Sequence, residues 1–194
     1  MWLGINPTTI AAFAEIENGS DRTIAVVSGA IVDSAVTDIL RRDLKRDDST
    51  YSQVIQNRVF QPDGPLGNLG PKSWMMYLLG YLSEDALDDL ATFVKIRNLF
   101  AHYSEHNSFE SQRVRDRCAN FKLLKSNVLK SEVVHDHKLT DGVQMLSGKG
   151  ICLHLVEYED AMETSKGKFI AVAKLFCAGL ELYRDNNLYS KPIF

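Results

Sequence analysis

The sequence predicts an all-α fold, a bundle of six or seven helices around one core. The first observation is periodicity, because apolar residues recur three and four positions apart along most of the chain, as in helices with one buried face. The second is the position of the turn-forming residues Gly, Pro, Asn and Asp, which are concentrated between the periodic stretches. The third is composition: 45% of the 194 residues are hydrophobic and 24% are charged, which suits a chain that buries a core.

Two helices are expected before residue 45. Residues 7–18 suit a first helix, because proline fits its first turn and Asn18-Gly19 favours its end. A longer helix follows over residues 21–44, with Asp21 as its expected N-cap. Its expected apolar stripe consists of Ile24, Val27, Ile31, Ala35 and Ile39. Gly29 lowers the stability of this helix by about 1 kcal/mol relative to alanine.

Five further helices are expected, with apolar spacing and capping residues as the evidence. They span residues 50–60, 71–79, 83–102, 110–124 and 165–186. Ser83 is the expected N-cap of the helix that ends at His102, and Glu84 and Asp85 place negative charge in its first turn. The last helix has a core stripe of Phe169, Val172, Phe176, Leu180 and Tyr183.

We expect residues 1–194 to form a single helical domain, because the sequence contains no repeat and no low-complexity linker. Residues 125–163 fit this pattern least well, since glycines interrupt them and no helical period is sustained. They are expected to form an insertion or excursion from the bundle. Residues 144–157 within them are expected to form a short strand or an irregular segment.

Charge and cysteine content indicate a cytoplasmic protein. The formal charge of −3 argues against general affinity for nucleic acid. The three cysteines, Cys118, Cys152 and Cys177, are odd in number and have no CxxC spacing, so we expect reduced thiols. The N-terminus lacks the features of a signal peptide, and no stretch of about 18 uncharged apolar residues is present, so no membrane partner is expected.

Arg97, Asn98 and His102 are the first candidate site, at the end of the helix over residues 83–102. A histidine can transfer protons near neutral pH and an arginine can stabilise charge on a phosphate, so the pair suits metal-independent cleavage of RNA. The alternative is structural. Arg97 would then bind a carboxylate such as that of Asp33, while Asn98 and His102 would hold the end of the helix.

The second candidate is the turn-rich loop that contains Gly64, Pro65, Leu66 and Gly67. Glycines allow a backbone to approach an anion closely, but the loop lacks the GxxxxGK[ST] pattern of a phosphate-binding loop. The favoured interpretation is a rigid corner between two helices.

The third candidate is a basic stretch, with nucleic-acid contact as one interpretation and a solvated helix face as the other. Its residues are Arg113, Arg117, Lys122 and Lys125. Aromatic residues are not interleaved with these cations, and no helix-turn-helix pattern is present. Elsewhere, His135, His137 and His154 lack diagnostic ligand spacing, so we expect no metal and no cofactor.

Three segments together resemble the mannitol operon repressor (MltR) family. They are residues 62–69 (PDGPLGNL), residues 75–82 (MMYLLGYL) and residues 95–102 (KIRNLFAH). The resemblance implies an all-helical protein associated with repression of sugar-alcohol uptake operons. It implies no DNA-reading element of its own, and therefore action through protein partners.

The Arg97-x4-His102 spacing also resembles the wider HEPN helical superfamily, many of whose members are ribonucleases. That resemblance implies that Arg97 and His102 act together at a homodimer interface, with Asn98 in support. Our leading hypothesis is a transcriptional regulator without enzyme activity, which binds a protein partner. The alternative is a HEPN-type endoribonuclease of the toxin or defence kind. Because a fold alone does not fix a function, both remain open at this point.

Overall fold

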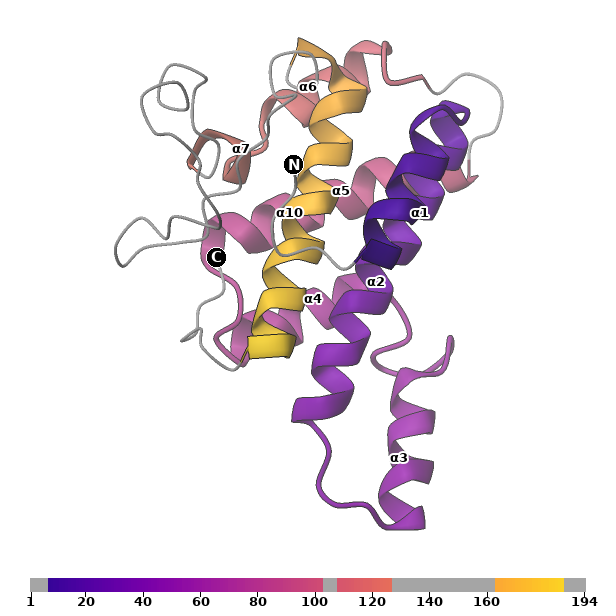
Figure 1. Cartoon of the computed structure of the whole chain (residues 1–194), viewed down its shortest axis with the longest axis vertical. Helices are drawn as coiled ribbons and strands as arrows, with labels where there is room; N and C mark the ends of the chain where they lie inside the picture. Colours follow the sequence, from indigo (N-terminus) through magenta and orange to yellow (C-terminus); the bar gives the residue numbers. More distant parts are fainter. Residues whose placement is uncertain (1–6, 103–107, 127–162, 187–194) are drawn as a thin grey trace.

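The structure is a computed structural model, and residues 7–102, 108–126 and 163–186 are described here. This part of the chain contains eight helices and no strand, which confirms the predicted all-α class (Figure 1). The helices are α1 (Pro7–Glu17), α2 (Asp21–Asp43), α3 (Thr50–Phe60), α4 (Leu69–Leu78), α5 (Glu84–His102), α6 (Gln112–Ala119), α7 (Leu123–Ser126) and α10 (Ser165–Asn186). The strand expected within residues 144–157 lies outside the described residues.

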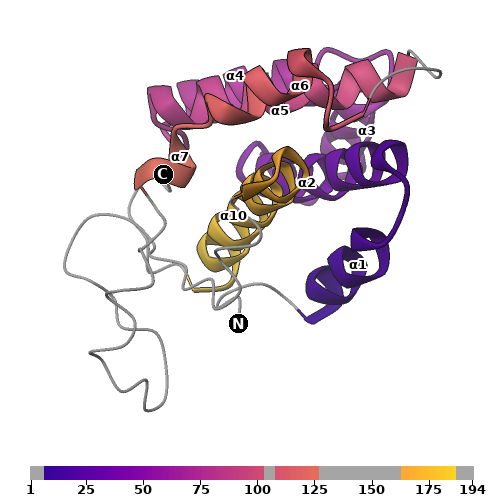
Figure 2. The same cartoon turned by 90° about the horizontal axis from the view of Figure 1, so that it is seen from above.

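The helices are arranged in layers around α2. Seen from above, α4, α5 and α6 form one layer over α2 and α10, and α1 lies on the far side of α2 (Figure 2). α2 packs against α1, α4, α5 and α10. By length and composition α2 is long and apolar enough to cross a membrane, but the core helix of a globular protein passes the same test. Its packing against four helices accounts for its apolar character.

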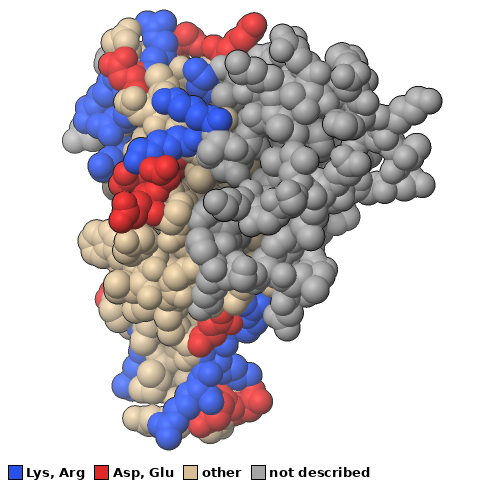
Figure 3. Space-filling view, turned by 90° about the vertical axis from the view of Figure 1, so that its left-hand side faces the viewer, with Lys and Arg blue, Asp and Glu red and all other residues tan. Residues whose placement is uncertain are grey.

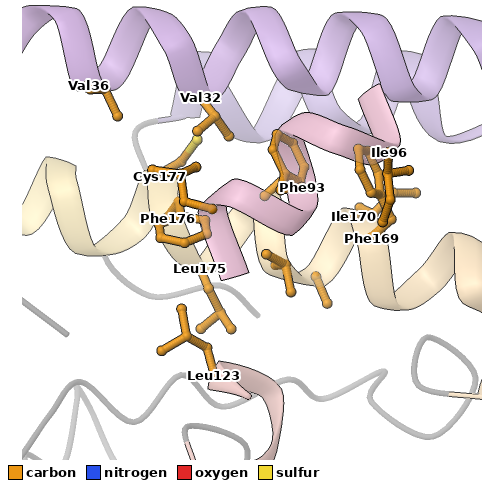
Figure 4. Packing of buried hydrophobic residues seen from close by; sticks show 14 of the residues in the cluster. Val32, Val36, Phe93, Ile96, Leu123, Phe169, Ile170, Leu175, Phe176 and Cys177 are labelled. Atoms are coloured by element: carbon orange, nitrogen blue, oxygen red, sulfur yellow. The ribbon is translucent and has the colours of Figure 1, made fainter. Parts of the chain in front are cut away.

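The core lies where α2, α5 and α10 meet (Figure 4). The rings of Phe93 and Phe169 stack with their centroids 4.4 Å apart. The ring of Phe109 packs against Phe169 at 5.3 Å and against Phe100 at 4.9 Å, which extends the aromatic cluster toward α6. Phe169, Val172, Phe176 and Leu180 are all buried, so the stripe predicted for the last helix is confirmed apart from the half-buried Tyr183.

The stripe predicted for α2 is only partly correct. Val27, Ile31 and Ala35 are half-buried at the edge of the core. The buried residues of α2 are Ile24, Ala25, Ser28, Gly29, Val32, Val36, Ile39 and Leu40. Because α2 is covered by α5 on one side and by α10 on another, its buried surface is wider than the single stripe of a surface helix.

The predicted N-cap of α2 is wrong by one residue. The N-cap is Ser20, whose Oγ accepts a hydrogen bond of 3.2 Å from the backbone N–H of Thr23. Asp21 has a different role, because its Oδ2 accepts from the Phe109 backbone N–H at 3.0 Å and from the Ser108 hydroxyl at 3.1 Å. This carboxylate therefore joins the segment before α6 to the start of α2.

The predicted helix over residues 110–124 is divided into α6 and α7. Asn120 ends α6, and the chain then turns at the buried carboxylate of Asp89 on α5. Asp89 accepts from the backbone N–H of Lys122 at 2.9 Å and from that of Leu123 at 2.7 Å. These amides open α7, so Asp89 caps a helix distant in sequence and interrupts the continuous helix that periodicity suggested.

Candidate functional site

Arg97, Asn98 and His102 lie along the last turns of α5. Arg97 is half-buried, and its Nη1 donates a hydrogen bond of 3.0 Å to Oδ1 of Asn98. His102 is exposed and ends the helix. Five positions separate Arg97 from His102, so their side chains leave the helix in directions about 140° apart. Within the described residues, no hydrogen bond or ion pair joins the two side chains.

The aliphatic part of Arg97 packs on Gly29 of α2. A Cβ atom at position 29 would lie 2.7 Å from Cγ of Arg97, closer than carbon atoms can approach without displacement. The missing side chain of Gly29 therefore provides the space through which Arg97 crosses α2. From the sequence, Gly29 was expected only to weaken the helix, because the side chain that packs on it comes from another helix.

The carboxylate expected to bind Arg97 has another partner. Oδ1 of Asp33 lies 2.8 Å from Nζ of Lys72, which comes from α4. The side chain of Lys72 is 3% exposed, whereas that of Asp33 is 33% exposed. An Arg97–Asp33 pair was thus the wrong prediction, because Lys72 is buried against α2 and needs the opposite charge there.

The loop between α3 and α4 is a packed corner. Cβ atoms at Gly64 and Gly67 would lie 2.3 Å from backbone carbonyl oxygens of Arg58 and Gln61, respectively. The backbone N–H of Leu66 donates to the Val59 carbonyl at 2.9 Å, and the Leu66 side chain is buried. Because carbonyl oxygens lie next to both glycines, the structure favours a packed corner over an anion-binding loop. Pro65 is exposed.

The basic residues on α6 and α7 do not form one uninterrupted patch. Nζ of Lys122 lies 2.7 Å from Oδ1 of Asp85 and 2.9 Å from Oδ2 of Asp88. The hydrogen bonds that Lys122 donates to these carboxylates raise its pKa above the ordinary value. Lys122 is therefore engaged by acidic groups, whereas Arg113 and Lys125 are exposed and Arg117 is half-buried.

An exposed apolar surface on α4 was not predicted from the sequence. Trp74 is 63% exposed and Leu78 is 77% exposed, and Tyr77 lies beside them. Their spacing of three and four positions places them on one side of the helix, and we call them the α4 face. The available signal was an aromatic residue on the side of α4 opposite the buried Met76.

Acidic residues follow the α4 face in the sequence. Because the chain turns directly from α4 into α5, the exposed Glu84, Asp85 and Asp88 follow the C-terminal end of α4. On the face of the molecule that Figure 3 draws, charged groups lie above and below an uncharged band at mid-height.

Comparison with known proteins adds the decisive observation. A family model described as mannitol repressor (MtlR) matches residues 16–149. The chain belongs to the mannitol repressor family. The fold is also similar to that in the X-ray structure of the MtlR–HPr complex from Escherichia coli, with a TM-score of 0.59 and 13% sequence identity. The similarity covers 90% of this chain and 97% of that one. No curated protein matches the chain.

Membership of the mannitol repressor family confirms the resemblance stated from residues 62–102. The matched range contains the α4 face, the end of α5 and the basic helix α6, while α10 lies beyond it. Within the part of the chain that the structure describes, no group of three or more His, Cys, Asp or Glu side chains is arranged to hold a metal ion. His135, His137 and His154 lie outside the described residues.

Proposed function

We propose that this protein is a repressor-type regulator of transcription that acts in the cytoplasm through a protein partner. Membership of the mannitol repressor family carries the proposal. The E. coli MtlR of similar fold was crystallised with HPr, and an HPr protein is the partner proposed here. We further propose that the whole chain forms one such domain, since α10 near the C-terminus packs on α2 near the N-terminus.

The α4 face is the proposed contact surface for this partner. Tryptophan and tyrosine supply a large share of the binding energy in many protein interfaces, and Trp74 and Tyr77 lie together here. Large exposed apolar side chains on one helix side are unfavourable in water unless something covers them. Asp85 and Asp88 are paired with Lys122, so the exposed apolar side chains of the α4 face, rather than charge, support the proposed contact.

The charges on α6 and α7 support a partner-dependent mechanism over direct reading of DNA. Lys122, one of the four cations considered for contact with nucleic acid, is bound by Asp85 and Asp88. Phosphate contacts need cations that are free to replace counterions. We therefore expect only weak, salt-sensitive binding to an operator fragment by the purified protein alone.

Isothermal titration calorimetry with HPr from the same organism tests the proposal. We expect wild type to bind, and the double variant Trp74→Ala and Leu78→Ala to lose at least about tenfold in affinity, the usual effect of truncating an anchor residue. Tyr51→Ala is the matched control, because Tyr51 is an exposed aromatic residue on α3. Absence of binding by folded wild type would contradict the proposed partner. Unchanged affinity in the double variant would contradict only the proposed surface.

A HEPN-type endoribonuclease is the second candidate function, and the exposure of His102 at the end of α5 favours it. In that case His102 would transfer a proton, Arg97 would stabilise the phosphate and Asn98 would hold Arg97 in place. Incubation of RNA with wild type and His102→Ala in the presence of EDTA distinguishes the two functions. Cleavage lost only in the variant would establish the nuclease, and no cleavage by folded wild type would exclude it.

A further inference from the structure

The buried side of α4 is more polar than its exposed side. Its buried residues are Lys72, Ser73 and Met76, of which only the methionine is apolar. Half-buried apolar residues flank this side, namely Leu69, Met75 and Leu79. The α4 face on the opposite side consists of large aromatic and aliphatic side chains in contact with solvent. A helix at the surface of a globular protein ordinarily has its most apolar side against the core, so apolar burial alone does not explain the orientation of α4.

An ion pair holds the buried side of α4 against α2. Lys72 is the only charged residue of α4, and its Nζ lies 2.8 Å from Oδ1 of Asp33 on α2. Ser73 makes no comparable contact with another helix, because its hydroxyl donates to the Gly70 carbonyl of α4 itself at 2.6 Å. A buried ammonium group is costly without an opposite charge beside it. The position of Asp33 therefore determines which side of α4 can face the bundle.

We propose that the Lys72–Asp33 pair positions α4 and keeps the α4 face turned outward. Without the carboxylate, a turn of α4 about its axis returns Lys72 to water and brings apolar side chains of the α4 face toward the bundle. Glycines lie near both ends of the helix, where such a turn has to be absorbed. An added Cβ at Gly70 would meet no neighbouring atom within 4 Å, so packing does not require that glycine. Gly80 follows the helix and has a φ of 78°.

The pair acts on the contact surface from behind. Residues 72 and 74 are about 200° apart around the helix, so Lys72 lies on the side of α4 opposite Trp74. Lys72 and Asp33 are therefore positioning residues, which a partner bound at the α4 face does not touch. The consequence for HPr binding rests on the function proposed above, whereas the orientation of α4 is a property of the chain alone.

Fluorescence of Trp74 tests the orientation of α4 without any partner. The chain has two tryptophans, so a Trp2→Phe background leaves Trp74 as the only one. In that background Trp74 should emit at long wavelength and be quenched readily by acrylamide, because it is exposed. Asp33→Ala should shift the emission to shorter wavelength and reduce the quenching. Asp38→Ala is the matched control, because Asp38 is an exposed residue of α2, and it should change neither signal.

Removal of the lysine as well should restore the native orientation. In the double variant Asp33→Ala and Lys72→Met no buried charge remains, and methionine suits the space of the lysine stem, so Trp74 should again be quenched readily. A variant that is merely destabilised would not recover in this way. Circular dichroism verifies folding, and Asp33→Asn, which keeps the shape of the side chain, replaces Asp33→Ala if the alanine variant is unfolded. Unchanged quenching in the folded single variant, or no recovery in the double variant, would overturn the proposal.

Calorimetry with HPr measures the consequence for the contact surface. Asp33→Ala should bind HPr at least about tenfold more weakly than wild type, and the double variant should recover the wild-type affinity. If wild type does not bind HPr, the proposed function fails, and the fluorescence of Trp74 still decides whether the pair orients α4. If wild type and Asp33→Ala bind HPr equally well, the pair does not position the contact surface.

Discussion

Arg97 makes structural contacts that its position in the sequence does not reveal. Its aliphatic part crosses α2 at Gly29, and its guanidinium donates to Asn98. The sequence correctly suggested that Arg97 lies on a semi-buried side of α5. It did not reveal Gly29 as the contact, because the meaning of a missing side chain depends on what another helix places against it.

Gly29→Ala is expected to destabilise the protein by about 1 to 3 kcal/mol, although alanine favours helices, because the new Cβ collides with Cγ of Arg97. In an Arg97→Ala background the same substitution should be neutral or stabilising, since the collision is gone. Urea unfolding of the four proteins in this double-mutant cycle gives the coupling free energy. A coupling near zero would contradict the contact.

At the scale of helices, periodicity predicted where most elements lie, and local chemistry decided their boundaries. The helices over residues 50–60 and 165–186 were predicted with the observed bounds. The division between α6 and α7 was not predictable, because it depends on a carboxylate on α5 that accepts amides of Lys122 and Leu123. The breadth of the buried side of α2 was missed for a similar reason, since two other helices cover it.

Asp89→Ala should destabilise the protein by about 2 to 4 kcal/mol, because it leaves two backbone N–H groups at the start of α7 without their acceptor. Asp89→Asn should have a smaller effect, since its one amide oxygen can replace Oδ2 as acceptor while its NH2 group replaces the Oδ1 acceptor of Lys122. Urea unfolding at pH 7 measures the difference. A small effect of the alanine variant would show that α7 does not depend on this cap.

Titration of Asp89 should make the free energy of unfolding depend on pH in a direction that can be stated. Burial raises the pKa of the Asp89 carboxyl in the folded protein, despite the opposing backbone hydrogen bonds from Lys122 and Leu123. Above the pKa of Asp89 in the folded protein, its buried carboxylate therefore lowers the free energy of unfolding. This penalty disappears as the pH falls below the pKa that the same carboxyl has in the unfolded chain. As the pH falls from 7 into acid, the stability of wild type should therefore rise relative to that of Asp89→Asn, which does not titrate. A fall in the stability of wild type relative to Asp89→Asn in acid would contradict this assignment.

At the scale of the whole molecule, the sequence predicted the fold class and the family more completely than the surfaces. Trp74 and Tyr51 lie on helices that were expected, yet their exposure depends on which side of each helix the bundle covers. Periodicity identifies an apolar side but does not distinguish a side turned to the core from one turned to a partner.

The cysteines provide a test of how tightly the core is closed. Burial raises the pKa of the Cys118 thiol to about 12 and also raises that of Cys177. In a Cys152→Ser variant, neither thiol should react with Ellman's reagent at pH 8 in the native state, because the thiolate is the reactive form. Both should react in guanidinium chloride. Rapid reaction of the native variant would show that the core opens readily.

The central position of α2 also affects how the protein is made. A ribosome completes α2 early, but α10, which covers much of it, is the last of the described helices to be synthesised. Until α10 emerges, the apolar surface of α2 has only part of its native cover, and such surface on a nascent chain invites aggregation or capture by chaperones. The bundle is therefore expected to close late in translation, and a premature stop before residue 165 would yield a product for degradation rather than a smaller working repressor.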